Sequence, residues 1–90
     1  MNKKELIDIV AEKTAVSKKD IADVVNATLD TITDALRHGD SVKFVGFGTF
    51  ETRHRSARKG KNPQTGEIVD IPPTTIASFK AGQGLKDAVK

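Results

Sequence analysis

Apolar residues recur at helical spacing through the first forty residues and predict two helices. From Lys3 to Thr14 the apolar side chains form one stripe, and Asn2 stands where an N-cap is expected. A second helix of about twenty residues is predicted to follow Ser17, which begins a capping-box pattern, and to end near Gly39. Its apolar stripe is longer than the short first helix can cover, which indicates a partner subunit.

The second half of the chain predicts a small antiparallel sheet and a last helix. Val42–Val45 is predicted to be a short strand, and the glycine-flanked turn 46–48 leads into a second strand at residues 49–52. Residues 76–80 are expected to form the strand that closes a three-stranded sheet. Residues 83–90 then return to helical spacing. The predicted fold class is therefore α+β.

A basic segment between these strands predicts a β-ribbon. Its outgoing flank has five cations in nine residues and no acidic residue; they are Arg53, Arg55, Arg58, Lys59 and Lys61. Asn62–Gly66 forms a turn with a fixed-φ proline and a permissive glycine, and residues 67–71 return as the second flank. Burying several unpaired cations is too unfavourable for this flank to enter the protein's own core. We expect a projecting arm that binds an anionic partner.

Composition agrees with one small domain that needs a partner subunit. The chain has 90 residues and no cysteine, so disulfides and Cys/His metal clusters are absent, and oligomerisation is the remaining means of stabilisation. The net charge is +3, but residues 1–40 carry six Lys/Arg and eight Asp/Glu, whereas residues 41–90 carry nine and four. The basic half favours a polyanionic partner. Without a signal peptide or an apolar run of membrane-spanning length, we expect a cytoplasmic protein with no membrane contact.

Catalytic and cofactor motifs are missing from the sequence. His38 and His54 lie in different contexts, and neither has a partner at catalytic or metal-ligand spacing. We therefore predict no enzyme activity, no metal, no cofactor and no small-molecule substrate. The four aromatic residues lie outside the arm, so we interpret them as residues of the core or of a dimer interface. The predicted dimer core consists of Leu29, Ile32, Leu36, Phe44, Phe47, Phe50 and Phe79.

A cationic ribbon suits duplex DNA, because its Arg and Lys side chains neutralise phosphates and enter the electronegative minor groove. Pro63 at the tip either wedges between base pairs or only shapes the turn, and its position alone leaves both roles open. The turn with Gly46 and Gly48 likewise either offers backbone N–H groups to a phosphate or is a simple hairpin turn anchored by Phe47.

The arm and the strands beside it contain a sequence pattern that is similar to that of a known protein family. The stretch GFGTFETRHRSARKGKNPQTGE, followed by Ile71-Pro72 and Phe79-Lys80, resembles the signature of the bacterial histone-like HU family, whose superfamily includes integration host factor. The resemblance extends over the whole chain. It departs from the common pattern at Ala81–Gln83, where one flanking phosphate contact is in doubt, and at Gly84, which should loosen the last helix.

The resemblance implies an intertwined homodimer whose arms embrace DNA, with Pro63 inserted at a kinked base step. The implied parts are a helical dimerisation base (1–40), a sheet saddle with the C-terminal helix (41–52 and 74–90), and a DNA-binding arm (53–73). The residues implied in DNA binding are Lys3, Gly46, Gly48, Arg53, Arg55, Arg58, Lys59, Lys61, Asn62, Pro63, Lys80 and Lys86.

The function predicted from the sequence is largely sequence-independent binding, bending and compaction of double-stranded DNA in the bacterial nucleoid. Three alternatives stay open at this point. A sequence-specific architectural factor of the integration host factor type is the nearest. An RNA-binding module is the second, although the wide, shallow minor groove of A-form RNA suits this ribbon less. The third is an interaction protein whose basic arm docks on an acidic protein.

Overall fold

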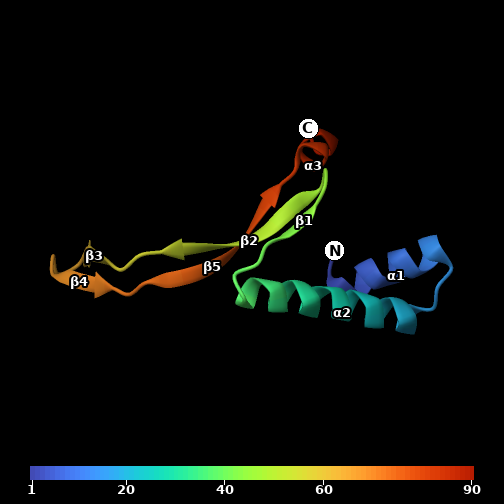
Figure 1. Cartoon of the computed structure of the whole chain (residues 1–90), viewed down its shortest axis with the longest axis horizontal. Coiled ribbons are helices and arrows are strands. Elements are labelled where there is room, and N and C mark those ends of the chain that lie inside the picture. The colour runs from blue at the N-terminus through green and yellow to red at the C-terminus, as the bar shows by residue number, and fades with distance from the viewer. The chain divides into compact units, whose positions relative to one another are not determined.

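The computed structural model describes residues 1–90 and has the predicted α+β class (Figure 1). It divides into two compact units, residues 1–34 and 35–90, so helix α2 begins in the first unit and ends in the second. The elements are α1 (Lys3–Thr14), α2 (Lys18–Arg37), β1 (Val42–Phe44), β2 (Gly48–Arg55), β3 (Arg58–Lys61), β4 (Ile68–Ile71), β5 (Thr74–Ala81) and α3 (Gln83–Ala88).

Side-chain caps fix where the two long helices begin. The Asn2 Oδ1 atom accepts a hydrogen bond from the Glu5 backbone N–H at 2.9 Å. The Ser17 Oγ atom accepts one from the Asp20 N–H at 3.2 Å. Each bond satisfies a donor that the first helical turn leaves without an intrahelical partner. The predicted N-caps of α1 and α2 are therefore confirmed.

The first unit contains a very small core. Ile7 and Ala11 of α1 pack against Ile21 of α2, and these three are the buried hydrophobic residues of the chain. Farther along α2, Val24 is 60% exposed and Leu29 is 48% exposed. Burial of apolar surface is the main favourable term in folding, so a core of this size leaves much of the stabilisation to other contacts.

The second unit is built on an antiparallel sheet with the order β1-β2-β5, as predicted. Strand β1 pairs with β2 only from Gly48 to Phe50, whereas β2 and β5 stay paired out to Arg55 opposite Thr74. The sheet is thus three-stranded at its base and becomes a two-stranded ribbon beyond Phe50. Both strands of this ribbon extend farther than the sequence pattern predicted.

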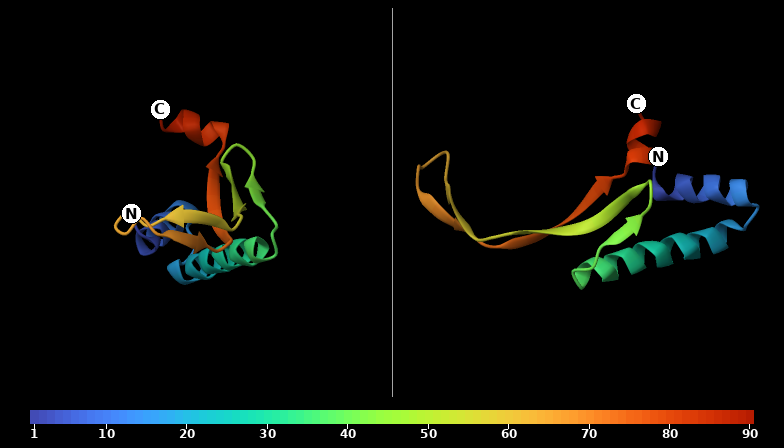
Figure 2. Two further views of the ribbon diagram at one scale, coloured as in Figure 1. Left: turned by 90° about the vertical axis from the view of Figure 1, so that its left-hand side faces the viewer. Right: turned by 45° about the horizontal axis from the view of Figure 1, so that its top comes forward.

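Strands β3 and β4 continue the ribbon as a separate two-stranded sheet (Figures 1 and 2). Between the two ladders, Ser56 and Ala57 face Pro72 and Pro73 without strand pairing. A proline has no N–H to donate, so two in succession interrupt the ladder. From the sequence a β-ribbon was predicted here, with the doubled proline as a stiff hinge where the arm rejoins the body, but a break in the strand pairing was not predicted.

The residue that caps the C-terminal end of α1 has an unfavourable backbone conformation. Ala15 has φ 56° and ψ 28°, the left-handed conformation, and it is the only non-glycine residue with positive φ. The Cβ atom makes this conformation unfavourable by about 1 kcal/mol or more, and glycine avoids the clash.

Replacing Ala15 with glycine should therefore stabilise the protein by about 0.5–1 kcal/mol, after allowance for the greater freedom of glycine in the unfolded chain. Chemical denaturation at one fixed protein concentration measures the change. The matched control is Ala27→Gly in the exposed interior of α2, which should destabilise by about 1 kcal/mol. Equal destabilisation by both substitutions would contradict strain at Ala15.

Candidate nucleic-acid interface

Three of the predicted DNA-binding cations share one face of the β2–β5 ribbon. Arg53 lies opposite Ile76 and Arg55 lies opposite Thr74, while Lys80 of β5 lies opposite Thr49. Directly opposed residues of an antiparallel pair project to the same side, and alternate residues of a strand share a face. The side chains of Arg53, Arg55 and Lys80 therefore form one exposed cationic face, which continues from the sheet into the ribbon.

Arg53 has an acidic neighbour on the same face. Its Nε atom lies 3.9 Å from Oε1 of Glu51, and the side chains are 61% and 33% exposed. Ion pairs in such exposed positions contribute at most about 1 kcal/mol, and often nothing measurable. Arg53 can therefore exchange Glu51 for a phosphate with little loss.

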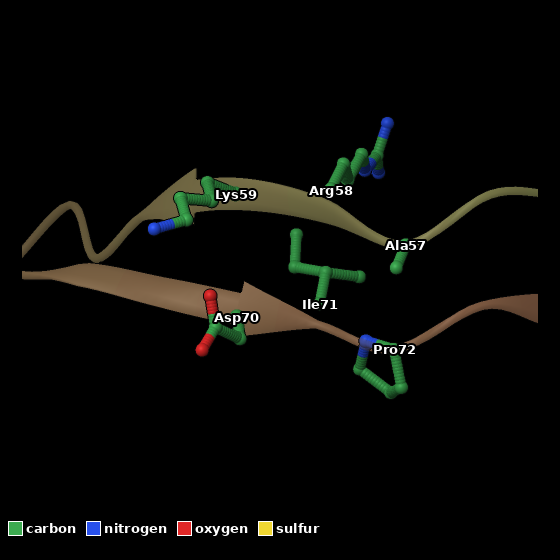
Figure 3. A pocket seen from close by; sticks show the side chains of 6 residues that line it. All are labelled: Ala57, Arg58, Lys59, Asp70, Ile71 and Pro72. Carbon is green, nitrogen blue, oxygen red and sulfur yellow. The ribbon is translucent and has the colours of Figure 1, made fainter.

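The outer ribbon exposes three further cations. Arg58, Lys59 and Lys61 all lie on β3, and Lys59 is directly opposite Asp70 of β4. In Figure 3 the side chains of Arg58 and Lys59 point in different directions, and that of Ile71 lies between the two strands. The outer ribbon thus presents positive charge on both of its faces.

Strands β3 and β4 have no hydrophobic core beneath them, and Gly60 allows a close side-chain contact between them. A Cβ atom at this position would lie 2.7 Å from Cδ1 of Ile71 and 3.9 Å from Cγ2 of Val69. The end of the Ile71 side chain therefore fills the space beside Gly60 that the Cβ atom of any other residue would need. This contact and the β3–β4 ladder hold the outer ribbon together.

The tip is a tightly hydrogen-bonded turn. The Asn62 N–H donates to the Glu67 carbonyl and the Gly66 N–H donates to the Asn62 carbonyl, both at 2.8 Å. The Asn62 Oδ1 atom accepts from the Gln64 N–H at 2.9 Å, and Gly66 takes φ +74°, which glycine adopts without strain. Pro63 is exposed within this turn. A rigid turn holds Pro63 in a fixed position, so shaping the turn and acting as a wedge are compatible roles.

A second rigid element joins the β1–β2 turn to α3. The carbonyl of Gly46 accepts from the Leu85 N–H at 3.1 Å, and that of Phe47 accepts from the Gly82 N–H at 2.8 Å. A Cβ atom on Gly82 would lie 2.9 Å from the Gly46 carbonyl carbon, so the contact requires glycine. Lys86 directly follows Leu85, and the same corner therefore carries the exposed residues Gly46 and Lys86.

Gly84 also belongs to this corner. A Cβ atom there would lie 2.6 Å from the Gly46 carbonyl oxygen. From the sequence, Gly84 was expected only to loosen the start of this helix, because glycine is a poor helix former. The structure adds a packing reason for glycine, because the first turn of α3 approaches the backbone of the β1–β2 turn closely.

Gly48 has a packing role that the sequence did not indicate. It is buried, and a Cβ atom would overlap the ring of Phe79 and lie 2.8 Å from the carbonyl oxygen of Lys80. The conformation and exposure of Gly46 (φ +82°) suit a backbone contact with an anion better than the buried position of Gly48 does. A phosphate contact at Gly48 stays a prediction.

Lys3 is the one predicted DNA-binding residue that belongs to the first unit. Its Nζ atom donates a hydrogen bond to Oδ1 of Asn26 at 3.0 Å, and both residues belong to the first unit. All the other predicted DNA-binding residues belong to the second unit. The contribution of Lys3 to DNA binding is therefore still a prediction.

The aromatic residues form an open cluster. The ring centroids of Phe50 and Phe79 are 4.8 Å apart, and those of Phe47 and Phe79 are 5.8 Å apart, while Phe44 makes edge contacts with Phe47 and Phe50. Phe44, Phe47 and Phe79 are nevertheless 41–52% exposed. In α2, Ile32 and Leu36 are half-buried and Leu29 is exposed. This single chain leaves every residue of the predicted dimer core partly open.

The incoming strand β5 also contributes to the cationic face, through three residues that were not among the predicted DNA-binding residues. Thr74, Ile76 and Ser78 pair with residues of β2 and share the face of Arg53 and Arg55. The sequence shows which residues of β2 are cationic, but it does not show which residues of β5 pair with them. The strand register was therefore needed to identify these residues. A hydrogen-bonded register places polar Thr74 and Ser78 within the same surface.

The surroundings of His54, the metal-ligating side chains and the lengths of the helices were also relevant to the sequence predictions. His54 has its Nδ1 atom 3.5 Å from Oγ1 of Thr75, and no three side chains of the metal-ligating kinds gather anywhere in the chain. None of the three helices combines the length and apolar character needed to cross a bilayer.

Comparison with known proteins identifies related chains of the same length. The family profile described as bacterial DNA-binding protein matches residues 1–90. DNA-binding protein HU-1 of Halalkalibacterium halodurans is 60% identical, and DNA-binding protein HU of Geobacillus stearothermophilus is 58% identical, each over all of both chains. The HU protein of Anabaena, solved in a cocrystal with DNA, superposes with a TM-score of 0.88 at 49% identity, covering 99% of this chain and 97% of that one.

The packing at Gly48 predicts the effect of adding a methyl group. Gly48→Ala should destabilise the protein by about 1–3 kcal/mol more than Gly39→Ala, because Gly39 has positive φ but nothing within 4 Å of an added Cβ. Denaturant titration measures the free energy of unfolding of both variants. Equal losses would show that Phe79 does not need the space above Gly48.

Proposed function

The chain belongs to the bacterial DNA-binding protein family that includes the HU proteins, and from this membership we propose how its residues act. It is a histone-like protein that binds, bends and compacts double-stranded DNA. The observation that carries the proposal is the arm, in which exposed cations line two ribbons that end in a rigid turn with Pro63.

The cations supply most of the affinity. Each phosphate that Arg53, Arg55, Arg58, Lys59 or Lys61 neutralises releases condensed counterions from DNA, so binding is strong at low salt and weakens steeply as salt rises. A two-stranded ribbon is narrow enough to follow a groove, and cations favour the electronegative minor groove. Arg and Lys on both faces of the outer ribbon suit contact with the two backbones that border such a groove.

Pro63 supplies the bend. Its ring is apolar and rigid, and the hydrogen bonds of Asn62 and Gly66 hold the turn that displays it. Inserting a wedge between base pairs costs a few kcal/mol of unstacking, which the contacts of a bent duplex offset. The proline therefore acts together with the cations, because only they hold the DNA against the arm.

The binding is largely independent of DNA sequence. Phosphate contacts position a protein but do not read bases, and the proposed contacts of the arm are mostly of this kind. The long Lys and Arg side chains are exposed and make few contacts that would fix them for base recognition. Asn62 has its Oδ1 atom engaged in the tip turn, which favours a structural role for that oxygen over base recognition.

The working form is a homodimer with two arms. The small core and the open residues of α2 and the Phe cluster leave apolar surface that a second copy would bury. In this arrangement residues 1–40 form the dimerisation base, residues 41–52 and 74–90 form the saddle, and residues 53–73 form each arm. Two arms on one DNA molecule also raise the effective concentration of the second contact.

Residues outside the arm extend the wrapped length. Gly46 and Lys86 share one rigid corner and Lys80 shares the face of the arm cations, so we assign them to phosphates beyond the groove contacts. Lys3 and Gly48 complete this set as weaker candidates. The protein would act in the cytoplasm, on the bacterial nucleoid, through binding and bending and without an enzymatic step.

Neutralising one arm cation should reduce the salt dependence of binding. For Lys61→Gln, the slope of log Kobs against log salt should become shallower by about one, with the same loss of affinity on two unrelated duplex sequences. Fluorescence anisotropy across a salt series measures both quantities. The control Lys13→Gln removes an exposed cation of α1 outside the interface and should leave the slope unchanged. Equal effects of the two substitutions would argue for non-specific attraction of DNA to net charge.

Removing the proposed wedge should separate bending from affinity. Pro63→Ala keeps all the cations, so we expect a clearly smaller bend with a loss of affinity of less than about tenfold. Energy transfer between dyes at the two ends of a duplex reports the bend. An unchanged bend in the folded variant would show that Pro63 only shapes the turn.

A further inference from the structure

The incoming strand of the arm carries apolar side chains that the chain leaves in water. Ile68 is 72% exposed and Val69 is 42% exposed, whereas Ile71 is half-buried. Ile68 lies directly opposite Lys61, in the last residue pair of β3 and β4 before the tip turn. A large apolar side chain is thus exposed beside the turn that holds Pro63.

The faces of the outer ribbon separate Ile68 from the other two. Val69 and Ile71 lie on the side of Gly60, where a Cβ atom would contact both of them. Because side chains alternate along a strand, Ile68 projects to the opposite face, together with Lys61. The Lys61 side chain bends towards the tip, since its Cε atom would lie 3.7 Å from a Cβ atom on Gly66. Ile68 is therefore the one large apolar residue on the face of the outer ribbon that carries Lys59, Lys61 and Asp70.

A single exposed isoleucine is ordinary on a protein surface, so exposure alone carries no argument. The placement of Ile68 indicates a DNA contact, because Lys61 and Lys59 on the same face would bring a DNA backbone against it. The deoxyribose rings and base edges inside a groove offer apolar surface between the charged backbones. An apolar side chain there loses contact with water only when DNA is bound.

We propose that Ile68 is a second apolar contact residue for duplex DNA, which packs in the groove beside the step that Pro63 opens and helps to hold the bend. The proposal rests on the DNA-binding function argued above. Its signature differs from that of the cations. Burial of an apolar side chain releases no counterions, so Ile68 should contribute equally at all salt concentrations.

The experiment compares Ile68→Ser with the matched control Val89→Ser in the full-length protein. Val89 directly follows α3 and is 74% exposed, so the control removes similar apolar surface outside the arm. For Ile68→Ser we expect about tenfold weaker binding to a duplex at every salt concentration, an unchanged salt slope and a smaller bend. Val89→Ser should bind and bend DNA as the unaltered protein does, and Ile68→Val should restore most of the affinity.

Three outcomes would overturn the proposal. Equal affinity and bend for Ile68→Ser and Val89→Ser would mean that Ile68 stays in water in the complex. A shallower salt slope for Ile68→Ser would mean that the substitution displaces Lys61, so that Ile68 acts only through the cation. Binding tightened by the substitution would indicate that Ile68 instead packs against a second copy of the chain and competes with DNA.

The failure of this proposal is distinguishable from failure of the proposed function. If the unaltered protein binds DNA weakly and without a steep salt dependence, the DNA-binding function itself is wrong. If it binds with a steep slope and bends the duplex, but Ile68→Ser does the same, only the role of Ile68 is wrong. A double variant with Pro63→Ala adds a further test, since two residues at one bent step should show non-additive losses of bending.

Discussion

The cationic strand of the arm cannot be buried in the protein's own core, and this electrostatic constraint shapes the second unit. Taking several unpaired cations out of water is far more unfavourable than the burial of a few apolar groups is favourable. The ribbon must therefore hold together without a core, through its ladders, through Ile71 packed over Gly60, and through the hydrogen bonds of the Asn62–Gly66 turn. A cationic surface that stays ordered in water can bind an anionic polymer without first being ordered.

The same constraint explains why the rest of the chain needs a second copy. Residues committed to the arm add nothing to a core, and the buried hydrophobic residues are Ile7, Ala11 and Ile21 alone. The half-open Phe cluster supplies apolar surface for an interface between subunits. Arm and interface are thus linked, because a chain this short can project an arm only if another subunit completes its core.

The parts of the fold that could be predicted from the sequence are those in which a single residue determines the local geometry. Asn2 and Ser17 cap their helices with their own side chains, so the starts of α1 and α2 were predicted correctly. The ladder interruption at Pro72 and Pro73 was missed because it depends on which residues face the prolines across the ribbon. Likewise, Gly48 lacks a side chain because the ring of Phe79, distant in sequence, occupies the space. Local rules do not report such cross-strand partners.

The central claim is that the arms wrap and bend duplex DNA, and binding to intact and nicked duplexes of one sequence across a salt series tests it most directly. A nick lowers the energy needed to deform DNA without changing its phosphate contacts appreciably. If the arms wrap and bend DNA, the slope of affinity against salt concentration is steep on both duplexes and the nicked duplex binds more tightly. Equal affinity for the two duplexes, or weak binding with little salt dependence, would contradict bending and leave only a general attraction between a basic protein and DNA.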